Sequence, residues 1–128
     1  MILGIDLGKK TTGLAISDGE LASPYKTISH KSTREAIDII SKICKIESIH
    51  KIILGYVEGG IKKYFEKFAQ KLRQLNPHIE VILWDETLTS RQATESMIKL
   101  DIPKNKRNKK IHEIAASLIL QSYLDENK

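Results

Sequence analysis

Acidic side chains follow three short apolar stretches of this 128-residue chain, at points where β-strands would end. Asp6 ends the stretch MILGID, Glu58 comes just after IILGYV, and Asp85 and Glu86 follow VILW. Parallel strands of an α/β sheet bring such ends together at one edge of the sheet. Converging carboxylates repel one another, and oxygen ligands that leave room for water suit Mg²⁺ or Mn²⁺. The spacing therefore predicts a metal site that could activate water for phosphodiester hydrolysis.

Asp6 is the most informative of these acids, because a carboxylate inside an apolar strand is costly to bury without a partner. We expect it to be a metal ligand. The first turn of the last expected helix adds His112 and Glu113 to the same edge. Each residue taken alone also has a simpler explanation: an acid after a strand commonly caps a turn or starts a helix, and a histidine at a helix start is commonly a surface residue. The argument for a site therefore depends on their convergence.

Two segments are candidates for binding phosphate. The turn GKKTT after Asp6 would offer donors from Lys9, Lys10, Thr11 and Thr12. The stretch 104–110, KNKRNKK, holds five basic residues and no acid, and the rest of the chain has 16 basic and 16 acidic residues. The whole net charge of +5 therefore lies in one segment, which is typical of a solvated loop and of a surface for a polyanion such as nucleic acid. We expect a mobile loop over 101–110, with these basic residues: Lys104, Lys106, Arg107, Lys109 and Lys110.

The apolar spacing predicts the elements that would position these residues. Strands are expected over 1–6, 13–17, 22–29, 50–56 and 79–86, and the third would be an edge strand because Pro24 cannot donate a ladder hydrogen bond. Capping-box patterns at Ser32 and Thr89 predict two helix starts, the second helix running to about Leu100. Amphipathic spacing predicts further helices over 61–75 and 111–124. This order predicts an α/β fold, with a central five-stranded mixed sheet flanked by helices.

The length and composition suit one domain over 1–128. The longest apolar stretches are only a few residues, which excludes a membrane span, and no charged lead-in precedes a long apolar run, so no signal peptide is expected. The single cysteine, Cys44, cannot form an intrachain disulfide and lies in an apolar helical pattern, where we expect it in the core. These features fit a cytoplasmic protein.

Four motifs occur in order over essentially the whole chain: GIDLGKKTTGLAIS, ILG before a loop and helix, DETLTSRQA, and HEIAASLILQSYL. Together they resemble the YqgF/RuvX family of bacterial RNase H-like proteins. The resemblance implies an RNase H-like fold and nuclease activity, with either pre-16S rRNA or Holliday junctions as substrate. It implies that Asp6 is the expected acid of the first strand, and that Asp85 and Glu86 match the start of the family's Asp-Glu-Arg motif.

Three positions depart from that family pattern. Thr87 stands where the family usually has arginine, and the segment YVEGG after ILG lacks the usual Leu-Pro-Leu. His112 stands where the last aspartate is expected, with Glu113 one position on. Histidine can ligate Mn²⁺ and can act as a base. The resemblance implies a catalytic set that lines the metals, Asp6, Glu86 and His112, with Asp85 and Glu113 in reserve.

The function we expect is metal-dependent nuclease action in 5′-end processing of pre-16S rRNA, with Mg²⁺ or Mn²⁺ as cofactor. One alternative is a Holliday junction resolvase, which would need a dimer to cut two strands symmetrically. Another is a catalytically weak RNA-binding module of ribosome assembly, motivated by Thr87 and His112. A looser likeness of the GIDLG hairpin to sugar kinases, actin and heat-shock chaperones would instead make the chain a partner-dependent ATP-binding lobe.

The partners we expect are nucleic acids, with pre-rRNA preferred over branched DNA, and ribosomal precursor particles, without a membrane. We expect the chain to act as a monomer or weak homodimer. The basic run 104–110 would hold RNA through phosphate contacts, so binding should be strong only at low salt.

Overall fold

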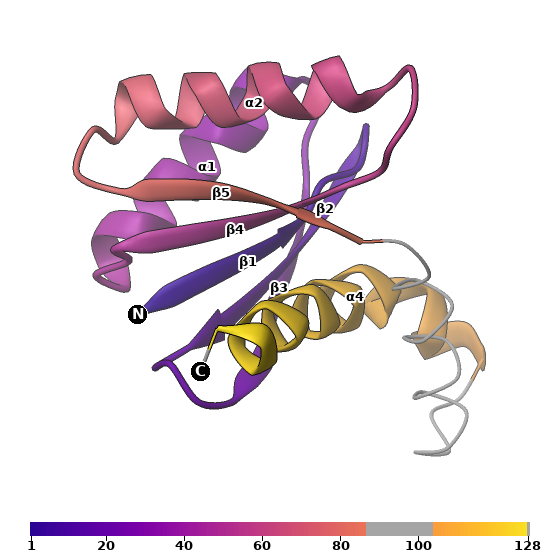
Figure 1. The fold of residues 1–128 in the computed structure, drawn as a ribbon. Coiled ribbons are helices and arrows are strands. Elements are labelled where there is room, and N and C mark those ends of the chain that lie inside the picture. Colours follow the sequence, from indigo (N-terminus) through magenta and orange to yellow (C-terminus); the bar gives the residue numbers. More distant parts are fainter. Residues whose placement is uncertain (87–103, 128) are drawn as a thin grey trace.

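The computed structural model describes residues 1–86 and 104–127, and it contains one mixed sheet of five strands. The strand order is β3-β2-β1-β4-β5, so β1 lies at the centre (Figure 1). The elements in chain order are β1 (Ile2–Asp6), β2 (Thr11–Ser17), β3 (Ala22–Ser29), α1 (Thr33–Ile46), β4 (Lys51–Tyr56), α2 (Lys62–Leu75), β5 (Glu80–Asp85) and α4 (Lys104–Glu126). The predicted five-stranded mixed sheet is confirmed.

The first three strands form an antiparallel meander, and β4 and β5 add parallel strands on the other side of β1. Strand β3 lies at the edge as Pro24 predicts, and its register with β2 shifts between Leu14 and Ala15, where Ala15 faces Pro24. The last residue of β1, Asp6, pairs with Gly13 of β2. The carboxyl ends of β1, β4 and β5 therefore share one edge of the sheet.

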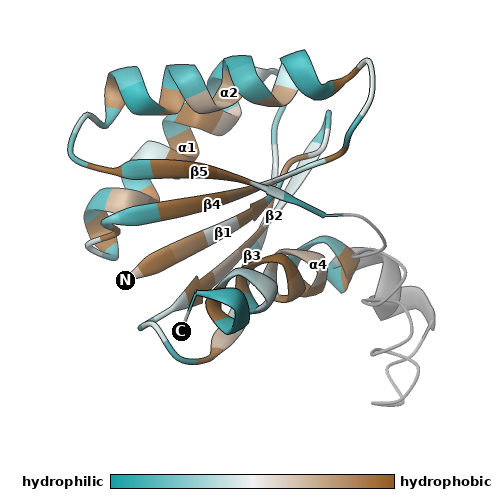
Figure 2. Cartoon of the chain, in the orientation of Figure 1, coloured by the Kyte–Doolittle hydropathy of each residue, from teal (hydrophilic) through white to brown (hydrophobic). Residues whose placement is uncertain are grey.

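The sheet is covered on both faces, which explains why all five residues of β1 are buried. Helices α1 and α2 cover one face and α4 covers the other (Figure 1). Successive strand residues point to opposite faces. Leu3 and Ile5 therefore pack under α1 and α2, whereas Ile2 packs under α4. By the same alternation Asp6 lies on the α4 face. Figure 2 shows the matching pattern, with hydrophobic strands and helices that are hydrophilic on the outside.

Helix α4 lies unusually close to the sheet because the strands beneath it carry glycines. A Cβ on Gly4 would lie 2.8 Å from Cβ of Leu120 and 3.0 Å from the carbonyl oxygen of Ala116. A Cβ on Gly13 would collide with the backbone of His112 and Glu113. Glycine is required at both positions for this close approach of two backbones. It brings the turn of α4 that carries His112 against the strand end that carries Asp6.

Helix α1 begins where its capping pattern predicts. The Ser32 hydroxyl accepts a hydrogen bond from the amide of Glu35 at 3.1 Å. The Glu35 carboxylate accepts from the amide of Lys31 at 3.2 Å, one residue before the cap. On the inner side of this helix Cys44 is buried, as predicted, and burial raises the pKa of its thiol to about 11. The thiol therefore stays protonated and packs as an apolar group.

One expectation about the basic run is wrong. Residues 104–110 were predicted as a loop, but their backbone forms the first turns of α4, which begins at Lys104 rather than at 111. The run has no apolar periodicity, so a pattern search does not detect it; lysine and arginine are nevertheless good helix formers, and the packed helix that follows can be extended. The predicted helix over 89–100 and residues 101–103 lie outside the described residues. Within the described part of the chain, no helix is long and apolar enough to cross a membrane.

The glycine contacts predict a position where a single methyl group disturbs the packing of α4. Gly13→Ala should lower the free energy of unfolding by about 1–3 kcal/mol, because the helix backbone must move away from β2. Urea denaturation measures the change. Gly60→Ala is the matched control, since a Cβ there meets nothing within 4 Å. Equal stability of the two variants would contradict the close packing.

Candidate active site

A buried carboxylate and a histidine meet at the carboxyl end of β1. Nδ1 of His112 lies 3.1 Å from Oδ2 of Asp6, although 106 residues separate them in the chain. The Asp6 side chain is 9% exposed and that of His112 is 38% exposed. The hydrogen bond to Asp6 raises the pKa of His112, against the opposing effect of partial burial. The imidazole therefore favours its charged form, which compensates the buried charge of Asp6.

Glu86 joins Asp6 from the neighbouring side of the sheet. Its amide donates to the Tyr56 carbonyl at 2.9 Å, which continues the pairing of β5 with β4 by one residue. Its carboxyl lies over Gly55, where a Cβ would meet Oε2 at 2.6 Å. The pKa of Glu86 is raised to about 8, first by burial and then by the charge of Asp6 and a hydrogen bond with it. Near neutral pH the Glu86 carboxyl group therefore stays protonated and can donate a hydrogen bond to Asp6.

The structure brings together Asp6, Glu86 and His112 but leaves the other two acidic candidates apart. Asp85 precedes Glu86, is exposed, and by strand alternation lies on the opposite face, with Leu83. Its charge still contributes to raising the pKa of Glu86. Glu113 turns toward β3, where its Oε2 accepts a hydrogen bond from the Thr27 hydroxyl at 3.1 Å.

The acid after β4 forms a small cluster of its own. The Tyr56 hydroxyl donates to Oε1 of Glu58 at 3.0 Å, and Nζ of Lys62 lies 3.4 Å from the same oxygen. The Lys62 ammonium also lies 5.0 Å from the centre of the Tyr56 ring. Glu58 therefore holds the entry to α2, which agrees with the helix-start explanation of this acid.

The turn after β1 presents lysines but buries one of the threonines predicted to bind phosphate. Lys9 and Lys10 are exposed and Thr11 is half-buried. Thr12 is fully buried, and its hydroxyl lies 2.8 Å from Nε2 of His30. Strand β2 begins at Thr11, so both threonines belong to the strand and only the lysines remain at the tip.

His30 is a residue that sequence reasoning missed. It is buried, its amide donates to the Lys10 carbonyl at 2.9 Å, and its ring contacts Thr12, so it holds the turn from two sides. Its Nδ1 is buried without a hydrogen-bond partner among the residues that the structure describes. A histidine between an edge strand and a helix cap gives no periodic signal. Only the spatial pairing with Thr12 reveals its role.

Two carboxylates in contact are the part of this site that fits a divalent cation. Hard oxygen donors suit Mg²⁺ or Mn²⁺, and Mg²⁺ commonly uses one or two carboxylates together with water and substrate phosphate. The pKa of Glu86 is raised by burial and then by the charge of Asp6. A bound cation would reduce the repulsion between these two acids. No group of three His, Cys, Asp or Glu residues within 1–86 and 104–127 is arranged to hold a metal ion. His112 lies against Asp6 as a hydrogen-bond partner, which leaves Asp6 and Glu86 as the candidate oxygen ligands.

Known proteins resemble the chain over nearly its whole length. A family model described as "RuvX: Holliday junction resolvase" matches residues 1–126. A protein of Caldanaerobacter subterraneus named "Putative pre-16S rRNA nuclease" is 41% identical, covering 99% of this chain and 97% of its own. Among solved structures, the Fowlpox virus resolvase with Holliday junction DNA has a TM-score of 0.64 at 18% identity, covering 98% and 97% of the two chains. Thermus thermophilus RuvC with a Holliday junction substrate has a TM-score of 0.60 at 11% identity, covering 99% and 96%. The expected RNase H-like fold is confirmed.

The carboxyl pair predicts a specific pH dependence of stability. The folded state keeps Glu86 protonated up to about pH 8, whereas an unperturbed glutamate ionises near 4.5. Folding therefore binds a proton in this window, and wild-type stability should fall as the pH rises from about 5 to about 9. Glu86→Gln cannot ionise, so its stability relative to wild type should rise over the same range.

Urea denaturation in EDTA at both ends of that pH range measures the effect. Glu20→Gln, which removes an exposed carboxylate remote from Asp6, is the control and should follow wild type. If the free energy of unfolding of Glu86→Gln changed with pH in the same way as that of wild type, the raised pKa of Glu86 would be contradicted.

Proposed function

Because this chain belongs to the RuvX family over residues 1–126, we propose that it is a divalent-metal-dependent nuclease that hydrolyses phosphodiester bonds in 5′-end maturation of the 16S rRNA precursor. The observation that carries the chemistry is the contact of two carboxyl groups, Asp6 and Glu86, at the carboxyl edge of the sheet. The preference for an rRNA substrate is supported by the name of a relative that is 41% identical along nearly the whole chain.

Asp6 and Glu86 would hold the cation, which would be Mg²⁺ or Mn²⁺. When bound, such an ion supplies an activated water and stabilises the leaving oxygen of a phosphodiester. The two residues are fixed by different elements: Asp6 by the central strand, and Glu86 by the hydrogen bond that its backbone amide donates to the Tyr56 carbonyl. Because the sheet sets their separation, the carboxyl groups are organised before substrate arrives.

His112 would exchange a proton with the substrate and would place a positive charge beside it. Its Nδ1 is held by Asp6, and its side chain remains 38% exposed, so a substrate phosphate can reach it. An imidazole fixed through one nitrogen can take up or release a proton at the other. The hydrogen bond to Asp6 raises the pKa of His112 and so extends its charged form to higher pH, which suits stabilisation of negative charge on the substrate. In this proposal His112 is held by Asp6 and serves as an acid or base, and it does not ligate the metal as the family pattern implied.

The lysines at the β1–β2 turn would hold the phosphate next to the scissile bond. Lys9 and Lys10 are exposed and follow directly on the strand that carries Asp6. The basic start of α4 would contact the same strand of nucleic acid. Cations in the first turns of a helix are disfavoured by the helix dipole, and a bound phosphate removes that penalty. Within this run Lys110 is exposed, two residues before His112.

A second function, resolution of Holliday junctions, is favoured by the description of the matching family model. It would need two copies of the chain to cut opposite strands. We place pre-rRNA first because a whole-length relative bears that name, and we infer a cytoplasmic protein that works as a monomer or weak homodimer on ribosomal precursor particles.

Cleavage of RNA tests the proposal directly. A labelled single-stranded RNA spanning a 16S 5′ leader should be cut by the wild-type chain with Mn²⁺ or Mg²⁺ and not with EDTA. Asp6→Asn should lower the rate by at least about 10²-fold, because it removes a charge that holds the cation. Asp18→Asn, an exposed acid between β2 and β3, should cut like wild type.

Four-way DNA junctions run in parallel decide the substrate. Paired symmetric cuts in the junction, without cuts in RNA, would replace rRNA processing by junction resolution. If the chain cleaves neither substrate and binds RNA in a way that depends on salt but not on Mg²⁺, an RNA-binding role in ribosome assembly would replace both nuclease functions.

Metal binding has a second readout that does not depend on activity. Mg²⁺ or Mn²⁺ at a hundredfold excess over its Kd should stabilise the wild-type chain by about 2.7 kcal/mol, as for any ligand that binds only the folded state. Asp6→Asn and Glu86→Gln should remove this stabilisation, and Asp18→Asn should keep it. Denaturant unfolding with and without the metal measures it, and equal stabilisation of all four proteins would contradict the carboxylate site.

A further inference from the structure

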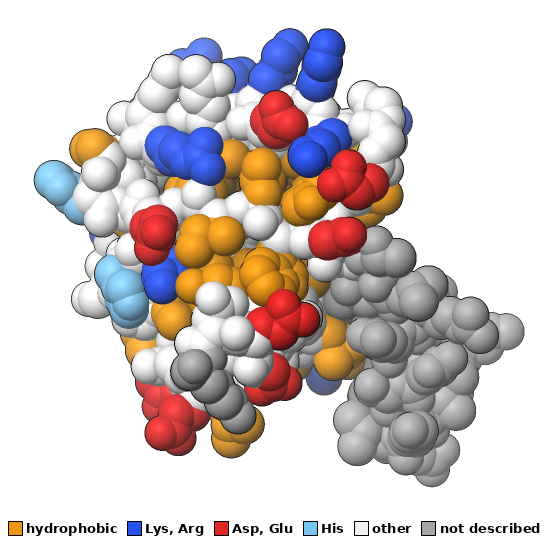
Figure 3. Space-filling view, in the orientation of Figure 1, with side chains coloured by type: hydrophobic (Ala, Val, Ile, Leu, Met, Phe, Trp, Pro, Cys, Tyr) orange, Lys and Arg blue, Asp and Glu red, His pale blue; other side chains and the backbone are white. Residues whose placement is uncertain are grey.

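A row of lysines runs along the outer side of α2, on the face of the molecule opposite α4. Lys63, Lys67 and Lys71 are four residues apart, so they lie one above another on the helix, and all three are exposed. We call these residues the α2 lysine row. The opposite side of the helix buries Phe65, Phe68, Ala69 and Leu72 against the sheet. In Figure 3 Lys and Arg side chains gather over α2 at the top of the view.

The stability of the helix does not explain this row. Like charges four residues apart destabilise a helix, and cations in the first turn oppose the helix dipole. The first turn of α2 contains no acid, and Glu66 is the only acid in the helix. Lys62 forms an ion pair with Glu58, but no ion pair joins any residue of the row to an acid within the described residues. Glu66 is one acid among five basic residues of this helix, so it offsets only part of the repulsion.

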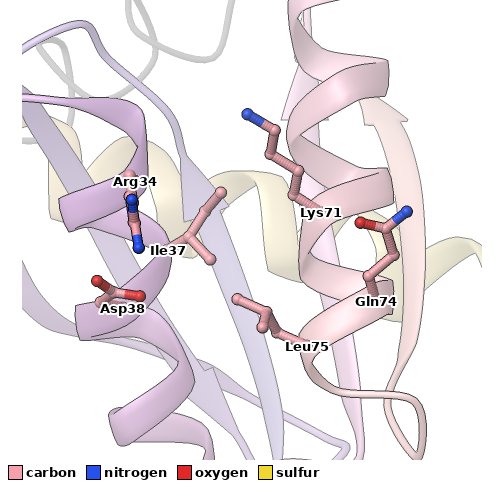
Figure 4. Close-up of a pocket in the computed structure, with 6 residues that line it drawn as sticks. All are labelled: Arg34, Ile37, Asp38, Lys71, Gln74 and Leu75. Atoms are coloured by element: carbon pink, nitrogen blue, oxygen red, sulfur yellow. The ribbon is translucent and has the colours of Figure 1, made fainter.

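A cleft between α1 and α2 extends the basic surface to a second helix. Arg34 of α1 and Lys71 and Gln74 of α2 line a space of about 380 Å³ with Ile37 and Leu75. In Figure 4 Ile37 and Leu75 point toward each other between the two helices, with Arg34 and Asp38 on the α1 side and Lys71 and Gln74 on the α2 side. The two helices together carry eight basic and three acidic residues. The net charge of this face matches what the basic run 104–110 contributes, although the sum over the whole chain hides it.

The direction of α2 connects this surface to the candidate site. The helix starts after β4 ends, at the edge of the sheet that carries Asp6 and Glu86, and it finishes before β5 begins at the other edge. Fourteen helical residues span about 20 Å. The lysine row therefore leads away from the edge of the site and across the far face.

We propose that the α2 lysine row, with Arg34, binds the phosphate backbone of an RNA segment distinct from the strand at the site. The argument is charge complementarity: lysines on one helix side match a line of phosphates. The row reads no sequence, because the aromatic rings of α2 are buried or turned inward, leaving no stacking platform beside it. The occupant is a folded or base-paired part of the same precursor RNA; the choice of RNA rests on the proposed function.

The test compares binding of two labelled RNAs to the full chain: a hairpin carrying a single-stranded 5′ tail, and the tail alone. Lys67→Gln/Lys71→Gln should weaken binding of the tailed hairpin about tenfold and reduce the slope of log Kd against log salt by about 2, because two phosphates are no longer neutralised by lysine. Binding of the tail alone should stay unchanged. Lys67→Arg/Lys71→Arg should bind both RNAs like wild type, because the charge is kept.

The matched control removes two exposed lysines that lie outside α1 and α2, as Lys26→Gln/Lys31→Gln, and should leave the salt slope close to wild type. An equal decrease in affinity for the control and for the row variant would overturn the proposal, since it would show a response to net charge alone. An equal decrease for a DNA hairpin of the same sequence is expected, because the row contacts phosphates and the choice of RNA rests on the proposed function.

The two proposals fail in different ways. If tailed-hairpin binding is insensitive to the row while the tail is still cleaved, the row proposal fails and the nuclease stands. If no RNA is cleaved under any condition but the row variant shows weaker hairpin binding and a smaller salt slope, the nuclease fails and the row is supported.

Discussion

A buried carboxylate on the central strand of the sheet is the constraint around which this protein is built. Asp6 lies at the end of β1, covered from both sides, in a position where an unpartnered charge would cost several kcal/mol. Two groups answer that cost. His112 forms a hydrogen bond with Asp6, and this bond raises the pKa of His112. The protonated Glu86 side chain forms a second hydrogen bond with Asp6. A divalent cation would replace that proton, so the same arrangement that stabilises the empty fold prepares it for catalysis.

The fold contributes to this arrangement through the packing of α4. Glycines on β1 and β2 let the helix backbone approach the sheet so closely that His112 reaches Asp6. The site and the second hydrophobic core are therefore one structural unit: Ala116, Ile119 and Leu120 pack just beyond the turn that bears His112. A substitution under the helix should disturb the site even though it touches no catalytic group.

Our two proposals assign different contacts with nucleic acid to the two faces of the sheet. The α4 face carries Asp6, Glu86 and His112, where we propose that a strand is cut. The α1–α2 face carries a surface in which basic residues outnumber acidic ones, suited to holding RNA. A substrate that is folded, like a precursor rRNA, could contact both through the edge of the sheet they share. This division separates affinity from chemistry and allows each to be altered alone.

Much of this protein is determined by local sequence. Short apolar runs mark the strands, Pro24 places β3 at the edge, and the Ser32 hydroxyl caps α1, because each depends on residues only a few positions apart. The positions of Asp6 and Glu86 at strand ends, and hence a site at one edge of the sheet, follow in the same way. The RNase H-like fold and the nuclease activity were inferred from the family motifs and not from these local patterns.

Other features were decided only by the tertiary structure. Which of two adjacent acids faces Asp6 depends on the side of the sheet to which the last residue of β5 points, and this selects Glu86 over Asp85. Glu113 binds Thr27, Thr12 is buried against His30, and His112 pairs with Asp6 across 106 residues. The start of α4 extends into a run with no periodicity. The reason is common to all of them: sequence patterns report the face a residue occupies on its own element, whereas partners across elements are set by how those elements pack.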